Sequence, residues 1–284
     1  MIVEVGGGLR SYSANGLELV DGYPADAMAS SARGEVLIPW PNRIEDGSYE
    51  FEGRRLQLPL TEPEAHNAIH GLVRWASWSV AAHEPDRAVV EHVLRPQPGY
   101  PFALALSVEY AVSAGGLEVR TTATNVGVDA CPFGSGAHPY LTAGTELIDP
   151  LELRVPARAV ILSDGRGLPV ERTTVEGTDY DFREARPLGS TVLNNAYTDL
   201  ERDEDGRARI ELRDPESGIG LGLWLDESYP YAQVFTGDPL PDVARRSLAV
   251  EPMTCPANAF RTGEALIRLE PGQTFTSAWG IGLL

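Results

Sequence analysis

The chain repeatedly alternates hydrophobic residues with small or polar ones, which is the period of a β-strand. In FALALSVEYAVS, residues 102–113, one face of such a strand carries Leu104, Leu106, Val108, Tyr110 and Val112. The glycines of AGG at 114–116 and the Thr-rich and Val-rich segment LEVRTTATNV come next. We therefore predict a β-hairpin closed by glycines over this part of the chain.

Two more segments have the same period. The stretches ARIELRD and IGLGLWLD, within 208–226, flank the turn-forming PESG and predict a second hairpin. The stretch LIRLEPGQTFTSAW, 266–279, predicts a third hairpin that turns at Pro271 and Gly272. No segment has the period of a helix three turns long, and 29 Gly and 22 Pro supply turn residues at short intervals.

These patterns predict an all-β protein, mostly antiparallel, built as a large sandwich or a barrel-like stack. No linker-like stretch, low-complexity segment or internal repeat divides the 284 residues, so we expect one domain over 1–284. The start of the chain lacks a basic stretch followed by an apolar run, and nowhere do eighteen apolar residues occur together. We expect neither a signal peptide nor a membrane span, and therefore a cytoplasmic protein.

The charge of the chain restricts its partners. The formal net charge is -18, and all 23 Lys+Arg positions are Arg. A surface this negative repels nucleic-acid backbones and anionic lipids, so we expect no nucleic-acid or membrane partner and a small, neutral ligand. The two cysteines, Cys131 and Cys255, form neither a metal-like pair nor a disulfide framework. We expect both to be small buried thiols in a reducing compartment.

Two polar segments in the first third of the chain are candidates for ligand contacts. In PWPNRIEDGSY, residues 39–49, Arg43 lies in a loop where it could hold a ligand oxygen or form a surface salt bridge. NAIHGLVRWASW, residues 67–78, combines His70 and Arg74 with Trp75 and Trp78. Such a set could stack on a sugar ring, although aromatic residues at this density are also typical of a core.

Two later residues have the chemistry of proton transfer. His138, in GSGAHPYL, is one of only five histidines and is either a packed core residue or a proton donor. Glu251 follows the apolar strand SLAV directly and precedes a proline, where a strand yields to a loop. A carboxylate there is either functional or part of a turn. His66 could also reach a site if its segment bends, but a loop histidine is the simpler interpretation.

Five ordered motifs resemble the aldose 1-epimerases, or galactose mutarotases, over nearly the whole chain. They are PNRI at 41–44, NAIHG at 67–71, HPYL at 138–141, QVFTGD at 233–238 and EPMTCPANAF at 251–260. The last motif is similar to the bacterial branch of the family. The resemblance implies a very large two-sheet β-sandwich, the galactose mutarotase-like supersandwich, which agrees with the period-two prediction.

The resemblance also implies a role for each residue that matches a family motif. His138 would be the general acid and Glu251 the general base, while the substrate-binding groups would be Arg43, His70 and Gln233. Where the family has an aspartate, this chain has LNNAYTDL at 193–200, and Asn194 is the nearest match. An amide donates and accepts hydrogen bonds but carries no charge, so the preference for a particular sugar is open. We do not expect Asp199 to replace the aspartate.

The implied function is that of an aldose 1-epimerase, an isomerase that interconverts the α and β anomers of a free aldose. This acid–base chemistry needs neither a metal nor an organic cofactor, and no His, Cys or Glu cluster has the spacing of a zinc site. Three alternatives remain open, namely a non-catalytic carbohydrate-binding sandwich, a sugar-phosphate 1-epimerase and a glycoside hydrolase. A hydrolase would need a second carboxylate in a motif. Neither the sugar nor an oligomeric state follows from these residues.

Overall fold

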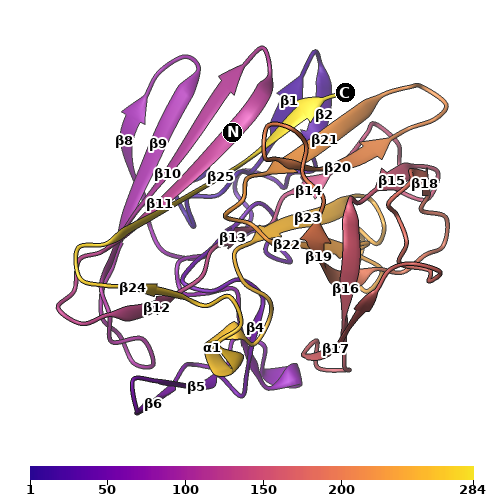
Figure 1. Ribbon diagram of the computed structural model, residues 1–284. Coiled ribbons are helices and arrows are strands. Elements are labelled where there is room, and N and C mark those ends of the chain that lie inside the picture. Colours follow the sequence, from indigo (N-terminus) through magenta and orange to yellow (C-terminus); the bar gives the residue numbers. More distant parts are fainter.

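The computed structural model describes residues 1–284 and consists almost entirely of β-strands (Figure 1). Most strands belong to two large antiparallel sheets, so the predicted large antiparallel β-sandwich is confirmed. The helices are one turn each: the 3-10 helix η1 (Pro63–Ala65) and the α-helix α1 (Ala259–Thr262). None of them has the length and apolar character needed to cross a membrane.

The first large sheet has ten strands. Along its main path these are β1 (Tyr12–Ala14), β2 (Leu17–Val20), β14 (Tyr140–Leu141), β23 (Leu248–Met253), β22 (Tyr231–Phe235), β19 (Asn194–Leu200), β16 (Ala157–Ser163) and β17 (Pro169–Thr174). The two remaining strands are β3 (Val36–Leu37) and β13 (Gly136–Ala137), and β13 pairs with both β23 and β3.

The second large sheet has nine strands. In spatial order these are β18 (Arg186–Pro187), β15 (Glu152–Arg154), β20 (Ala208–Arg213), β21 (Gly220–Leu225), β25 (Thr274–Leu283), β11 (Gly116–Asn125), β10 (Leu104–Ser113), β9 (Arg87–Leu94) and β8 (Ser79–His83). Three two-stranded sheets complete the fold. They pair β4 (Arg43–Glu45) with β7 (Asn67–Ile69), β5 (Ser48–Phe51) with β6 (Arg54–Gln57), and β12 (Cys131–Phe133) with β24 (Ile267–Leu269).

Two of the three predicted hairpins are confirmed. Strands β10 and β11 pair along their whole length, and so do β20 and β21. The third, around Pro271 and Gly272, is wrong, because β24 pairs with β12 whereas β25 lies between β11 and β21. Gly272 donates its N–H to the carbonyl of Asn125, at the end of β11 (2.8 Å). The turn therefore passes the chain from a small sheet to a large one, and alternation alone does not reveal which strand is the partner.

The two large sheets share one hydrophobic core. A single cluster of 54 buried residues includes Val234 and Val250 from the first sheet and Val108 from the second. Because successive side chains of a strand point to opposite faces, Gln233 and Glu251 lie on the face of the first sheet that is turned away from this core. Because the core is single, we propose that residues 1–284 form one domain.

Part of the segment between β3 and β8, including His70, lines a cleft on this outer face, and its course depends on a close approach at Gly71. Gly71 has φ +73, and a Cβ atom there would lie 2.0 Å from the carbonyl oxygen of Ile38, at the end of β3. Leu72 donates its N–H to the same oxygen at 2.7 Å. Only glycine allows both the left-handed backbone and this contact, so Gly71 fixes where His70 is held.

We predict that Gly71→Ala destabilises the fold far more than Gly53→Ala. Both glycines have φ +73, but no atom lies within 4 Å of a Cβ built on Gly53. Gly53→Ala should therefore lower the free energy of unfolding by only about 1–2 kcal/mol, the penalty for a left-handed residue. Gly71→Ala adds a backbone clash and should cost at least about 2 kcal/mol more.

Urea denaturation of the two variants and the native chain measures this difference. Equal losses in both variants would mean that the contact between Gly71 and Ile38 does not constrain the chain.

Candidate active site

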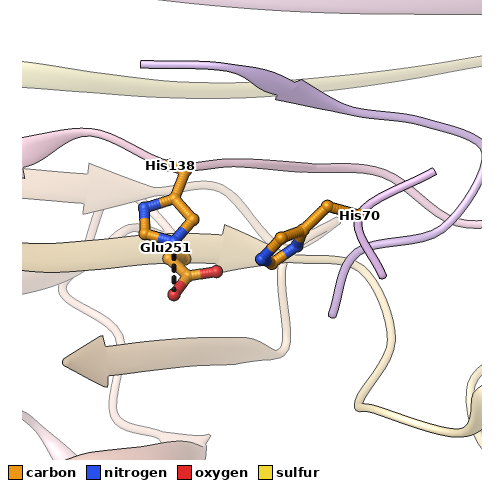
Figure 2. A group of neighbouring side chains, drawn as sticks. All are labelled: His70, His138 and Glu251. Atoms are coloured by element: carbon orange, nitrogen blue, oxygen red, sulfur yellow. Dashed lines mark ion pairs between the residues drawn. The ribbon is translucent and has the colours of Figure 1, made fainter. Parts of the chain in front are cut away.

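The register of the first sheet brings His138 and Glu251 together. Strand β14 pairs Tyr140 with Ala249 of β23. Two residues earlier in the same register, His138 lies opposite Glu251. On the other side of β23, Gln233 of β22 is also paired with Glu251. The Nε2 atom of His138 is 3.3 Å from Oε1 of Glu251 (Figure 2). A contact between residues 113 positions apart is thus set by strand pairing.

Both groups are deeply buried, which changes their protonation. His138 is 4% exposed and Glu251 is 3% exposed. Burial raises the pKa of Glu251, against the opposing effect of Arg43, and burial lowers the pKa of His138. A carboxylate beside a neutral imidazole, or a carboxylic acid beside an imidazolium, would leave an unpaired charge in this site. The pair therefore holds one proton between its two members around neutral pH.

One carboxylate oxygen of the pair has no partner in the chain. Oε2 of Glu251 is a buried polar atom without a hydrogen bond. In Figure 2 this second oxygen points toward the side on which His70 lies. Nδ1 of His138 is likewise buried without a partner, so each member of the pair keeps one unused hydrogen-bonding atom.

A stack of side chains supports the imidazole of His138. Its ring lies over that of Tyr140, with the centroids 4.9 Å apart and the planes at 13°. The guanidinium of Arg33 lies 3.9 Å from the centre of the Tyr140 ring, and Asp21 pairs with Arg33 at 2.8 Å. The sequence analysis missed Tyr140, although the period of two in HPY places it on the same face as His138.

His70 reaches the site from the end of β7. Asn42 and His70 form one more pair beyond the β4–β7 ladder, with the N–H of His70 donating to the carbonyl of Asn42 at 2.9 Å. The N–H of Asn42 donates in turn to Nδ1 of His70 at 3.1 Å, which leaves Nε2 of a neutral ring as a donor. Burial, together with the nearby His138, Arg74 and Arg43, holds the pKa of His70 well below its ordinary value, so the ring is neutral.

Arg43 is both a cleft residue and a salt-bridged one. Its Nε and Nη2 donate to the two oxygens of Glu62 at 2.8 and 2.7 Å. Asn67 also donates to Glu62 at 3.0 Å. Although burial opposes it, these hydrogen bonds hold the pKa of Glu62 below its ordinary value. Glu62 thus orients the guanidinium, whose Nη1 makes only a long contact of 3.5 Å to Oδ1 of Asn42. Nothing in the sequence alone pairs Arg43 with Glu62.

Three amides form a chain beside His138 and Glu251. Asn42 donates to Oε1 of Gln233 at 3.4 Å, and Nε2 of Gln233 donates to Oδ1 of Asn194 at 2.8 Å. The Nδ2 group of Asn194 is left to donate elsewhere. Asn195 instead donates to the carbonyl of Ile161 at 3.1 Å. Of the two neighbouring residues Asn194 and Asn195, only Asn194 lines this cleft.

The segment NAIHGLVRWASW divides between the core and the rim of the site. Trp78 is 2% exposed and belongs to the core, whereas Trp75 is 55% exposed and lines the cleft. The guanidinium of Arg74 lies 4.6 Å from the centre of the Trp75 ring and pairs with Glu35 at 3.2 Å. Burial raises the pKa of Glu35 to about 7 despite Arg74. Glu35 was missed because no motif surrounds it.

The remaining candidates lie outside the site. His66 is in a loop and contacts Asp46 at 2.8 Å, with 62% of its side chain exposed. Asp199, at the far end of β19, pairs with Arg172 at 2.6 Å and does not replace the missing aspartate. Cys131 and Cys255 are free and buried, as predicted.

All six predicted site residues line one cleft. Its volume is about 420 Å³, and its wall includes Arg43, His70, His138, Asn194, Gln233 and Glu251. Volumes of this size are typical of small-ligand sites. The cleft combines an acid–base pair on its floor with amides, an arginine and an aromatic residue around it, which suits a polyhydroxylated ligand.

The same floor has the donor set of a metal site. The ligand atoms of His70, His138 and Glu251 all lie within 4.8 Å of one another, and zinc accepts one carboxylate and two imidazoles. A cation here would be bound by the same lone pairs of His138 and Glu251 that otherwise hold the shared proton. Metal binding and proton transfer at this pair therefore exclude each other.

Comparison with known proteins identifies the family of the chain. The family model described as aldose 1-epimerase matches residues 1–281. Two proteins of Escherichia coli (strain K12) are similar over almost the whole chain. The uncharacterized protein YihR is 34% identical over 96% of this chain and 86% of its own length, and the uncharacterized protein YphB is 27% identical over 97% and 92%.

Solved structures share the fold. The GalM/aldose epimerase homologue from C. elegans has a TM-score of 0.88 at 19% identity, with 100% of this chain and 94% of that chain covered. The galactose 1-epimerase from Lactobacillus acidophilus NCFM has a TM-score of 0.81 at 20% identity, with coverage of 100% and 90%. At these identities the likeness concerns the fold alone. The family match and the identity to YihR extend the resemblance seen in the motifs to almost the whole chain. The chain therefore belongs to the aldose 1-epimerase family.

Proposed function

We propose that this protein is an aldose 1-epimerase that interconverts the α and β anomers of a free aldose by opening and reclosing the sugar ring. The family supports an isomerase of this general type. The observation that carries the specific proposal is the buried contact of 3.3 Å between His138 and Glu251 on the floor of a polar cleft. It supplies one proton donor and one proton acceptor at a single place.

The chemistry of anomer exchange needs such a pair. Glu251 takes the proton of the anomeric hydroxyl while His138 gives a proton to the ring oxygen, and the bond between the anomeric carbon and the ring oxygen breaks. The product is an open-chain aldehyde with a free hydroxyl. Rotation about the bond between the first two carbons presents the other face, and reclosure returns both protons. No co-reactant is consumed, so a metal or organic cofactor is not required for proton balance.

The protonation of His138 and Glu251 is compatible with these roles. The single proton of the pair can lie on Glu251 or on His138, and both arrangements are neutral overall. A sugar hydroxyl that donates to the carboxylate stabilises its ionised form and so favours the proton on His138. Binding of the substrate thus converts the pair into the acid and base that the reaction uses.

The other groups of the cleft would hold the sugar. The neutral His70 offers its Nε2–H, Arg43 offers Nη1, and Gln233 and Asn194 form a hydrogen-bonded edge for hydroxyl groups. Trp75 at the rim offers an exposed aromatic face. The sugar therefore meets polar groups along its edges and one aromatic residue at the entrance.

The alternative functions are less well supported by the site. A carbohydrate-binding protein has no use for a buried acid–base pair, whose burial is costly. A glycoside hydrolase would need a second carboxylate across the scissile bond. Of the two other glutamates that line the cleft, Glu62 is held by Arg43 and Glu64 lies exposed on η1 at the protein surface. The arginines of the cleft, Arg43 and Arg74, both pair with glutamates, which does not favour a phosphate group.

We predict that Glu251→Gln and His138→Asn each slow anomer exchange by about 10²–10⁴-fold, because each removes one partner of the proton transfer. Polarimetry of freshly dissolved α-glucose and α-galactose measures the approach to equilibrium. The matched controls are Glu50→Gln and His83→Asn, two exposed positions outside the cleft. They should retain native rates.

Retention of activity in both site variants, with the fold intact by circular dichroism, would refute the assigned roles. A native chain that accelerates neither these sugars nor a wider panel of aldoses, yet still binds them, would be a binding protein.

The activity should have a bell-shaped dependence on pH. Below the lower pKa of the pair both members are protonated and no base is left, and above the upper pKa neither is protonated and no acid is left. Burial lowers the pKa of His138, so activity should persist well below the ordinary histidine value of about 6.5. Burial raises the pKa of Glu251 to about 8, so activity should fall near that pH.

Values of kcat/KM, obtained from initial rates at each pH, test this profile. Circular dichroism at each pH verifies that the protein stays folded. An alkaline limb near the ordinary histidine value would contradict the raised upper pKa.

We predict that Asn194→Asp changes sugar binding more than the chemical step. An aspartate keeps the bond from Gln233 Nε2 to the Oδ1 position and replaces the Nδ2 donor with a second, charged acceptor. A charge-assisted bond to a sugar hydroxyl should lower KM about threefold to tenfold, with kcat nearly unchanged. Steady-state kinetics with glucose and galactose measures the changes in KM and kcat separately. A fall in kcat at constant KM would place Asn194 in proton transfer instead.

A further inference from the structure

The imidazole of His138 lacks the hydrogen bond that usually orients a histidine in a proton-transfer site. Its Nε2 lies 3.3 Å from Glu251, but its Nδ1 is buried and no other residue accepts a hydrogen bond from it. In most such sites the second ring nitrogen donates to a carboxylate or a backbone carbonyl, which sets the orientation of the ring. The orientation of the His138 ring therefore has to come from packing.

Two rings enclose this imidazole. The ring of Tyr140 is stacked on it, with the centroids 4.9 Å apart and the planes at 13°. The ring of His70 meets it edge to face, with the centroids 5.3 Å apart and the planes at 80° (Figure 2). Rotation of the imidazole about the bond between Cβ and Cγ would drive its edge into the Tyr140 ring. The stack thus fixes the plane in which Nε2 points at Glu251.

Tyr140 is itself held at both ends of its side chain. The guanidinium carbon of Arg33 lies 3.9 Å from the centre of its ring, and its hydroxyl donates to the carbonyl of Ser31 at 3.0 Å. Arg33 is 2% exposed and Tyr140 is 1% exposed, so water does not weaken the attraction between the cation and the face of the ring. The ring on which His138 is stacked therefore has one position.

Arg33 is fixed in turn by the frame that carries Glu251. Its Nη1 donates to Oδ2 of Asp21 at 2.8 Å and to Oγ of Ser247 at 3.1 Å. Ser247 also donates to Asp21, at 2.7 Å. Since Ser247 directly precedes β23, the strand of Glu251, the support of the imidazole and its carboxylate partner are attached to the same strand.

Packing alone does not explain a buried arginine at this place. Burial lowers the pKa of Arg33 despite the neighbouring Asp21, which shows that the environment disfavours the charge. An apolar side chain of similar volume would fill the space under Tyr140 without that cost. What distinguishes the guanidinium is its flat, charged face, which attracts an aromatic ring and keeps it in place.

Resting on the proposed function, we propose that Tyr140 and Arg33 are positioning residues of anomer exchange, which hold the ring of His138 by stacking in place of a hydrogen bond to Nδ1. Tyr140 fixes the plane of the imidazole, and Arg33, held by Asp21, fixes Tyr140. Both act on the chemical step, because a shift of about 1 Å in a reacting group can slow a reaction about 10²-fold. Binding of the sugar relies on other side chains of the cleft.

Polarimetric kinetics of Tyr140 variants tests this role on an aldose that the native chain turns over. Tyr140→Leu removes the stacked ring and should lower kcat by about 10–100-fold, with KM changed less than about threefold. Tyr140→Phe keeps the ring and loses only the hydroxyl. Its kcat should therefore exceed that of Tyr140→Leu by at least about tenfold.

Arg33→Met is the second test, because methionine keeps much of the length of the side chain without the guanidinium. Asp21 retains a cation, since Arg246 also donates to it at 3.0 Å. The Tyr140 ring stays but is no longer held, so kcat should fall by about threefold to tenfold at nearly constant KM. This variant decides the question by the same measurement if Tyr140→Leu does not fold.

The matched controls delete equivalent groups that do not line the cleft. Tyr100→Leu removes a buried tyrosine whose hydroxyl donates to the carbonyl of Pro132 at 2.8 Å. Arg207→Met removes a guanidinium that lies 3.8 Å from the centre of the Trp224 ring. Both should retain the native kcat when all variants are assayed below their midpoints of thermal unfolding.

Three results would overturn the positioning role and leave the epimerase proposal intact. They are losses of kcat no larger than in the matched controls, a rise in KM at constant kcat, and an equal loss in Tyr140→Phe and Tyr140→Leu. The last result would make the hydroxyl, rather than the stacked ring, the functional group. A native chain that accelerates no aldose would overturn both proposals, because the stack would then have no proton transfer to support.

Discussion

The antiparallel register around β23 is the constraint on which the site depends. It places His138 on one side of Glu251 and Gln233 on the other, with the side chains on the face away from the core. Val250 and Val234, their neighbours in sequence, point into the core and cannot change faces without unpairing the strands. A slip of one residue would exchange cleft and core positions, so the packing that stabilises the sandwich also keeps His138 and Glu251 together.

Burial gives this pair its chemistry at the expense of stability. Two ionisable groups that are almost fully enclosed favour the state in which their combined charge is zero, and that state contains one acid and one base. The stack of Tyr140 and Arg33 fixes the imidazole ring, while Oε2 of Glu251 stays without a partner. Nδ1 of His138 is also buried without a partner, so the pair is incomplete in hydrogen bonding by itself.

The sequence predicted what is local or carried by a motif. Hairpins with short loops followed from alternation and glycine, whereas the hairpin at Pro271 failed because its two strands find partners far away in the chain. Five of the site residues came from motifs, and Asn194 came from the segment where the chain departs from the family. Strand pairing brings His138, Glu251, Gln233 and Asn194 together, and packing of the separate β4–β7 pair adds Arg43 and His70 to the cleft. Glu62 and Glu35 were not predictable, because each is defined only by its contact with an arginine from another segment.

Two residues of the cleft occupy a backbone region that side chains usually avoid. Asn42 has φ 55 and His70 has φ 60, and they face each other across the end of the β4–β7 ladder. Each conformation costs about 1–3 kcal/mol, which persists only when surrounding contacts impose it. Here three contacts impose it: the bond from the His70 N–H to the Asn42 carbonyl, the bond from the Asn42 N–H to Nδ1 of His70, and the close packing of Gly71. The donor at Nε2 of His70 is therefore oriented before a ligand arrives, so that binding energy is not spent on arranging it and remains available to the transition state.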